Sequence, residues 1–204
     1  WIGEDIPVPF SVAQEASQRL ADGNWAGLPI TREALDVLQS YHESIADAGV
    51  MPSPECLTVE QHERLFILNY PGGSRLNRTI GMIVTAMLTA KSGYKIGFQF
   101  DPYRIILDVP ARTTVKDLLA ILKGFVPEVG SLLRFAIKDS PSLKPQLLHS
   151  ARKMGAIAPD ADIGKFGMKK LMEAYSDTPL YTEAVERFLF HQSVSYTHLR
   201  AHET

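Results

Sequence analysis

The residue types best suited to binding chemistry lie in one short segment, 71–79, which reads Pro-Gly-Gly-Ser-Arg-Leu-Asn-Arg-Thr. It follows a run of strand-forming residues and opens a helix, where free N–H groups favour an anion. Glycines let a backbone approach another surface closely. Arg75 and Arg78 are unfavourable for the helix dipole at that end, which an anionic partner would explain. The pattern indicates either a phosphate-backbone contact by Arg75, Asn77 and Arg78, or a tight turn that Arg75 and Asn77 hold together. The residues alone favour the turn and leave both open.

A second group of candidate residues is basic. Residues 138–170 hold seven lysines and arginines against three aspartates, among them Arg152 and Lys153. A row of such side chains could follow a phosphate backbone without reading sequence. A solvated helix face explains the same pattern, and the residue types do not decide between the two.

Aromatic residues form a third group. An exposed Trp1 could stack on an unpaired base, whereas Trp25 is better explained as a core residue. The segment Asp101-Pro102-Tyr103-Arg104 is most simply a hairpin corner, with a binding role for Tyr103 and Arg104 as the alternative.

Motifs for catalysis and metal binding are missing from the sequence. The segment Gly72-Gly73-Ser74 resembles a phosphate loop in outline, but the Lys-Ser/Thr pair and the spacing are absent. There is no His-Glu-x-x-His pattern, and Cys56 is the single cysteine, which excludes an internal disulfide and a multi-cysteine metal site. We therefore predict no catalytic residue, no metal ligand and no cofactor bound by this segment itself.

Composition is that of an ordinary globular protein. The 204 residues are 45% hydrophobic and 22% charged, with a net charge of −2. A near-neutral charge means that any nucleic-acid contact must come from local patches. No apolar run is long enough to cross a bilayer, so no membrane partner is expected and a cytoplasmic location fits.

The elements that must position these residues follow from periodicity. Helices are expected at about 11–21, with Ser11 as cap and Gln14 as its partner, and at 31–48, with Thr31 as cap and Tyr41 in its apolar stripe. A strand at 64–70, a helix at 75–91 that Gly93 ends, and two alternating strands at 94–109 come next. Everything from 113 onward is helical, and Thr114 with Asp117 opens the first of these helices. We therefore predict an α+β fold, with a small strand–helix–strand–strand sheet and one packed helix, followed by a helical bundle.

The predicted divisions are a helical lead-in at 1–55 that completes an upstream domain, an α+β core at 56–111 and a helical bundle at 112–193. Trp1 reads as the middle of a domain, because no methionine precedes it. Residues 194–204 lack an apolar period and resemble a translated sequencing adapter, so we interpret them as a non-native tail.

Five segments, in the right order, resemble the C-terminal accessory region of archaeal-type Lhr (large helicase-related) helicases. The corresponding family patterns are Trp-x-Gly-Glu, Gly-x-Arg-x-Asn-x-x-x-Gly, Asp-Pro-Tyr-Arg-Ile, Ala-Arg-Arg-x-Gly-Ala-Ile and Tyr-x-Asp-Thr-Pro-Val-Tyr. They fall at Trp1–Pro9, Gly73–Gly81, Asp101–Ile105, Ala151–Ile157 and Tyr175–Tyr181.

The resemblance implies an accessory region of an ATP-dependent 3′–5′ helicase that acts on DNA or RNA–DNA hybrids and is linked to DNA repair. Single-stranded DNA or a hybrid would be the partner, gripped by this region. Upstream RecA-like and winged-helix domains of the same chain would bind ATP and Mg²⁺. In that family a tryptophan of this region stacks on a base, and Trp1 is its match. A protein-interaction scaffold and a glycosylase-like repair enzyme remain the alternatives.

Overall fold

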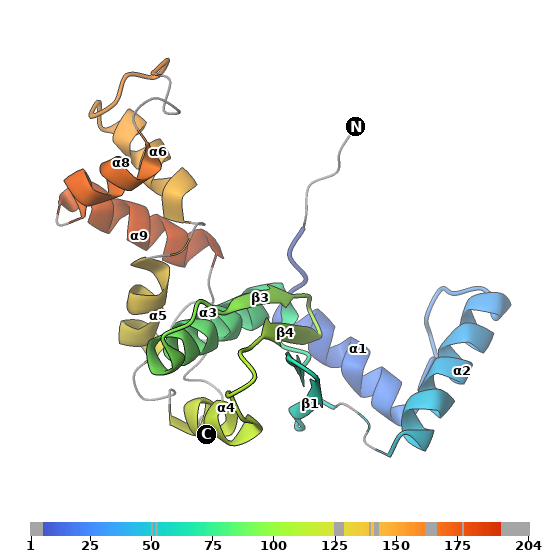
Figure 1. Ribbon diagram of the computed structural model, residues 1–204. Coiled ribbons are helices and arrows are strands. Elements are labelled where there is room, and N and C mark those ends of the chain that lie inside the picture. The colour runs from blue at the N-terminus through green and yellow to red at the C-terminus, as the bar shows by residue number, and fades with distance from the viewer. Residues whose placement is uncertain are drawn as a thin grey trace.

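A computed structural model describes residues 6–49, 51, 53–124, 129–138, 140, 143–161, 167–176 and 178–192. Its centre is a small antiparallel sheet with one long helix packed on it, and further helices extend to either side (Figure 1). This confirms the predicted α+β class with a helical part.

The sheet has four strands in the order β1-β2-β4-β3, all antiparallel. The predicted strand–helix–strand–strand series is confirmed as β2 (Leu65–Asn69), a helix, β3 (Gly97–Phe100) and β4 (Arg104–Asp108). The prediction omitted β1 (Thr58–His62), because Thr-Val-Glu-Gln-His lacks a buried face. That strand exists through its pairing with β2 rather than through its own hydrophobic pattern.

The central helix is α3 (Gly73–Ser92), which covers one face of the sheet and ends at a left-handed Gly93 as predicted. The sheet side chains that face it are fully buried: Phe66, Leu68, Ile105 and Leu107. Gly81 allows the close approach of helix and sheet, because a Cβ at this position would lie 2.5 Å from the Phe98 ring.

The N-terminal arm consists of α1 (Phe10–Asp22) and α2 (Arg32–Asp47). Thr31 caps α2 as predicted, since its Oγ1 accepts a hydrogen bond from the Ala34 N–H at 3.3 Å. The predicted Ser11 cap of α1 is wrong. The helix begins one residue earlier, after Pro9, and has no side-chain cap. Proline fixes φ for this start, and Gln14 instead donates to the Pro71 carbonyl at 2.7 Å.

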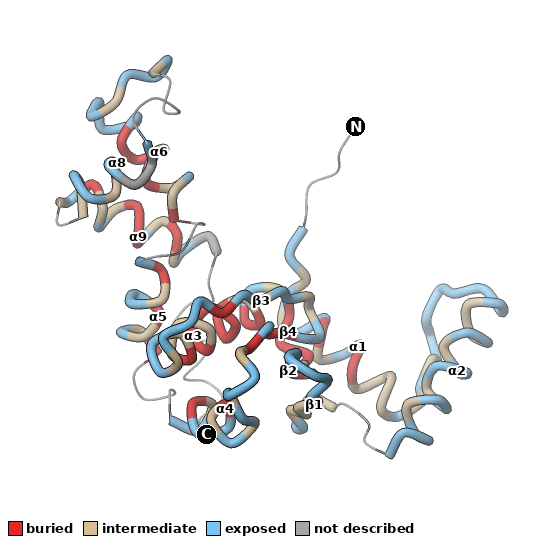
Figure 2. The backbone as a smooth tube through the Cα atoms, viewed as in Figure 1, coloured by how far each residue is buried: buried red, intermediate tan, exposed pale blue. Residues whose placement is uncertain are grey.

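The C-terminal helices are α4 (Val115–Gly124), α5 (Val129–Lys138), α6 (Leu143–Lys153), α8 (Met168–Tyr175) and α9 (Pro179–Gln192). Helices α4 and α5 pack on α3, whereas α6 and α9 pack on each other (Figure 1). Buried side chains form one continuous hydrophobic cluster from the sheet through α3 to α9. Figure 2 shows this buried core through the centre and the left part, while α2 is exposed or half-buried along its length.

Among the described residues, a cation–π contact and an ion pair link α9 to α3 and α5. The Arg78 guanidinium of α3 lies 5.4 Å from the centre of the Phe188 ring, a cation–π distance. Arg134 of α5 pairs with Glu186 of α9 at 2.7 Å.

The predicted start of α4 is confirmed and gives a pH prediction. Thr114 and Asp117 exchange hydrogen bonds in a capping box, and Asp117 also pairs with Lys91 of α3. Hydrogen bonds from Lys91 and Thr114 hold the pKa of Asp117 well below its ordinary value of 3.8. A lowered folded-state pKa contributes stability above about pH 4, and that stability is lost as the pH falls.

We therefore expect Asp117→Asn to lower the free energy of unfolding most above about pH 4. The difference from the unchanged chain should shrink as the pH falls below about 4, because the unfolded chain then takes up a proton at Asp117 that the folded chain does not. Urea unfolding followed by circular dichroism between pH 6 and 2.5 measures this. Asp36→Asn, at an exposed position on α2, is the control. Equal pH dependence of the Asp117 variant and the unchanged chain would contradict the prediction.

Candidate nucleic-acid interface

The turn before α3 is occupied by the chain itself. The N–H groups of Gly72, Gly73 and Ser74 donate to the carbonyls of Tyr70, Pro102 and Val8 at 2.8, 2.9 and 3.0 Å. The Ser74 hydroxyl also accepts a hydrogen bond from the Val8 N–H at 2.9 Å. Of the two interpretations left open by the sequence, these three N–H groups therefore support the tight turn, which the residues favoured, and not the anion contact. The glycines allow close approach of the N-terminal segment, which belongs to the same chain.

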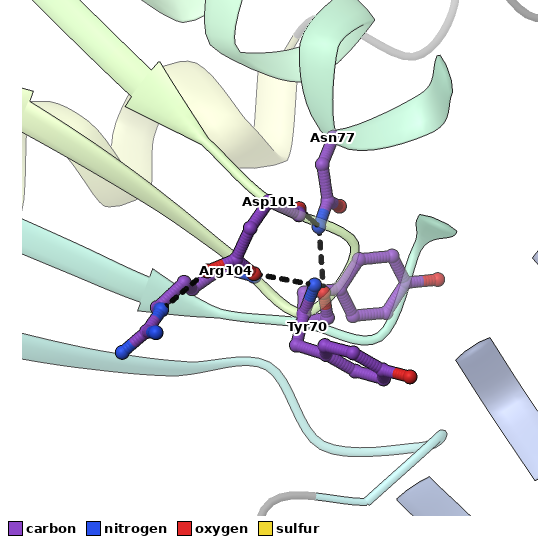
Figure 3. Close-up of polar contacts among 5 residues, drawn as sticks. Tyr70, Asn77, Asp101 and Arg104 are labelled. Carbon is purple, nitrogen blue, oxygen red and sulfur yellow. Dashed lines mark hydrogen bonds and ion pairs between the residues drawn. The ribbon is translucent and has the colours of Figure 1, made fainter. Parts of the chain in front are cut away.

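Asn77 is completely buried, at 0% exposure. Its side-chain amide donates to the carbonyls of Tyr70 and Asp101, both at 2.9 Å, and so joins the end of β2 to the β3–β4 turn (Figure 3). The prediction that Asn77 contacts nucleic acid is corrected, because a side chain with no exposed surface cannot reach a ligand. Of the two interpretations of this segment, the tight turn describes Asn77.

The two arginines of this segment differ in their surroundings. Arg75 is exposed on the first turn of α3, and among the described residues it forms no ion pair. Arg78 is half-buried against Phe188, and burial lowers the pKa of its guanidinium. Arg75 therefore presents its charge to solvent, whereas Arg78 lies at the contact between α3 and α9.

The hairpin corner at 101–104 is confirmed. One oxygen of Asp101 accepts hydrogen bonds from the N–H groups of Tyr103 and Arg104 at 2.8 and 3.0 Å. The other oxygen accepts from Nε of Arg104. This hydrogen bond and the carboxylate charge raise the pKa of Arg104. The corner therefore fixes both candidate side chains relative to the sheet, and Figure 3 shows Arg104 turned away from Asn77.

Tyr103 and Arg104 line a cleft of about 370 Å³ between the N-terminal arm and the sheet end. We call it the aromatic cleft. Its polar and aromatic lining comprises Arg19, Trp25, Tyr41, Asn69, Asp101, Tyr103 and Arg104. The prediction that Trp25 is a core residue is wrong, because it is only partly buried. Tyr41 was assigned to the apolar stripe of its helix, and only the tertiary structure shows that it lines a cleft together with residues of the sheet end.

Arg152 and Lys153 are exposed in the last turn of α6. Arg152 donates to the Ala161 carbonyl at 3.4 Å. Helix α6 and the N-terminal arm lie on opposite sides of α3 (Figure 1), so the structure does not bring these two cations to the aromatic cleft. Trp1 lies outside the described residues.

The described part of the chain also bears on metal binding and on membrane insertion. There, no three or more His, Cys, Asp or Glu side chains group closely enough to hold a metal ion. No helix in that part has the length and apolar character needed to span a membrane.

Comparison with known proteins shows which fold and which family the chain shares. Its fold matches the structure of Mycobacterium smegmatis helicase Lhr bound to ssDNA and AMP-PNP, with a TM-score of 0.70 and 16% sequence identity. The match covers 100% of this chain and 29% of that chain, so the chain spans less than a third of the helicase. No curated protein matches in sequence. Residues 51–198 match the family described as DEAD/H associated. Because that match covers most of the chain, the protein belongs to the DEAD/H associated family.

Proposed function

We propose that the chain is the accessory nucleic-acid-binding region of an ATP-dependent helicase that moves 3′ to 5′ on DNA or RNA–DNA hybrids. In this role it grips the tracking strand, while RecA-like and winged-helix domains upstream bind ATP and Mg²⁺ and supply the force. Membership of a helicase-associated family supports the proposal. So does the fold shared with helicase Lhr, a protein whose structure contains ssDNA and AMP-PNP.

The observation that carries the proposal is that exposed basic side chains remain without a carboxylate partner within the described ranges. Arg75, Arg152 and Lys153 are exposed, and no carboxylate among the described residues pairs with them. In the part of the chain that the structure describes, other basic side chains do form ion pairs: Arg19, Arg64, Lys91, Arg104 and Arg134. A chain with a net charge of −2 therefore still presents local positive charge that a phosphate backbone could neutralise.

The N-terminal segment limits how far Trp1 can lie from Arg75. Two hydrogen bonds hold Val8 against Ser74, the residue next to Arg75. Seven residues separate Trp1 from Val8 in sequence, a reach of at most about 25 Å when fully extended. Stacking of Trp1 on a base is therefore compatible with a phosphate contact by Arg75 on the same strand.

The test is the salt dependence of binding to a labelled single-stranded oligonucleotide of twenty thymidines. Each lost phosphate contact should reduce the slope of log K against log salt by about 0.7 for a single strand. We expect this reduction for Arg75→Gln and about twice as much for the double variant Arg152→Gln/Lys153→Gln. Arg64→Gln is the control, because Arg64 is also exposed but pairs with Asp108 at 3.2 Å.

Salt-independent binding, or none, would contradict the proposal and leave the protein-interaction scaffold in its place. The glycosylase-like alternative gains no support from the aromatic cleft. A base-removing enzyme needs a carboxylate free to act, whereas both oxygens of Asp101 accept hydrogen bonds from the corner itself.

A further inference from the structure

We propose that the aromatic cleft binds one unpaired nucleotide of the strand, with the base on the tyrosine rings and the phosphate on Arg104. This inference rests on the proposed function and adds a second contact point to it. The cleft lies where the N-terminal arm meets the sheet, so its α1 and α2 walls are outside the segment 51–198 that matches the family.

The aromatic side chains that line the cleft are at least partly exposed to solvent. Tyr41 is 55% exposed and Tyr103 is 42% exposed, and Trp25 beside them is only partly buried. The rings come from three separate parts of the chain: the α1–α2 connection, α2 and the β3–β4 corner. Every nucleobase has a flat π-face, so rings collected in this way suit stacking without sequence preference.

Arg104 supplies hydrogen-bond donors to the aromatic cleft from a guanidinium that is held in position. Its Nε is held by Asp101, which is itself fixed by two backbone N–H groups. Within the described residues, the guanidinium is hydrogen-bonded through Nε to Asp101, and Arg104 is one of the residues that line the cleft. A guanidinium fixed at one edge can offer two parallel donors to a phosphate with little further loss of freedom.

The charge of the cleft lining and the volume of the cleft restrict which class of ligand can bind there. Both arginines of the cleft are already paired, Arg19 with Glu15 and Arg104 with Asp101, so the lining is close to neutral. A free triphosphate would find no surplus of positive charge there, whereas a nucleotide within a strand carries one phosphate charge. A volume of about 370 Å³ is at the small end for ligand sites, which fits one nucleotide and excludes a duplex.

The first experiment measures equilibrium binding of the full chain to the labelled twenty-thymidine strand. Loss of one stacked base should weaken binding about five- to 150-fold, and we expect this for Tyr103→Leu and for Tyr41→Leu. Arg104→Gln should weaken binding through the loss of hydrogen-bond donors, with little change in the salt slope because Asp101 already balances its charge. Tyr94→Leu is the matched control, because Tyr94 is 63% exposed and lines a different pocket. Arg112→Gln, at another exposed arginine, is the control for charge.

The second experiment needs no variant and so does not depend on folding of a mutant. A strand that carries 5-iodouracil is cross-linked to the unchanged chain by ultraviolet light, and the modified peptides are identified by mass spectrometry. Cross-links to Tyr41, Trp25 or Tyr103 are the expected result.

The outcomes separate this inference from the proposed function. Salt-dependent binding with unchanged affinity in both tyrosine variants, and cross-links only elsewhere, would overturn the cleft as a nucleotide site. The proposed strand contacts of Arg75, Arg152 and Lys153 would not be affected by that result. Failure of the unchanged chain to bind the strand would overturn both.

Discussion

Replacing Asn77 with aspartate is expected to lower the free energy of unfolding by about 3–5 kcal/mol at neutral pH, the range for an uncompensated buried charge. The substitution keeps the shape and exchanges a double donor for an acceptor. Asn77 donates to two carbonyls from a position with no exposed surface. A carboxylate would face the same two oxygen atoms and repel them.

The pH dependence of this variant has a defined sign. Burial raises the pKa of the new carboxyl above its value in the unfolded chain. The lost stability should therefore return in part as the pH falls through that raised pKa, because the protonated acid can donate to one carbonyl. Urea unfolding at pH 7 and pH 5 measures both effects. Asn24→Asp is the control, since Asn24 is exposed and its Oδ1 already acts as an acceptor, from the Ala26 N–H.

A loss below about 1 kcal/mol for Asn77→Asp would contradict the assignment of Asn77 as the tie between β2 and the β3–β4 corner, since a single surface change costs no more than this. The assignment also connects to function. The corner carries Tyr103 and Arg104, so loosening it should weaken the strand binding that we propose, even under conditions where the variant remains folded.

Gly73→Ala is expected to produce the second large loss of stability. Gly73 has φ of +72°, and a Cβ there would lie 2.8 Å from the Val8 carbonyl oxygen and 2.9 Å from the Phe10 nitrogen. The left-handed backbone alone costs about 1–3 kcal/mol for a residue with a side chain. Overpacking adds about 1–3 kcal/mol, because the obstacle is backbone that cannot rotate away.

Gly93→Ala separates the two contributions. Gly93 has the same φ of +72° but no atom within 4 Å of a Cβ at that position, so its loss reports the backbone strain alone. Thermal and urea unfolding of both variants should show the larger loss for Gly73→Ala. Equal losses would mean that the N-terminal segment moves freely away from α3, so that the contact between Val8 and Ser74 no longer limits the reach of Trp1 toward Arg75.

Several local features were predictable because they depend on residues close in sequence. The Thr31 cap, the left-handed Gly93 and the Thr114–Asp117 capping box each involve contacts within one turn of chain. The hairpin corner followed from Asp101 and Pro102 in the same way. The family resemblance likewise pointed to a helicase-associated region, and the match over residues 51–198 confirms that coarser statement.

The candidate site was harder to predict because its geometry depends on distant parts of the chain. Asn77 was a candidate binding residue because its residue type and its place at a helix start do not show whether the side chain is exposed or buried. Its burial arises from carbonyls 7 and 24 residues away. Tyr41 looked like a packing residue for the equivalent reason, since helical spacing marks the apolar face and not the element that covers it.

The sequence by itself determined the α+β class, most helix ends and the absence of a phosphate loop, because these depend on residue types and short-range spacing. Tertiary structure alone decided which polar groups remain available. It uses the N–H groups of the glycine turn to hold Val8 and Pro102, and it brings Tyr41 on α2 beside Tyr103 on the sheet. The physical reason is that hydrogen-bond partners and burial are set by long-range packing, which no local pattern of residues records.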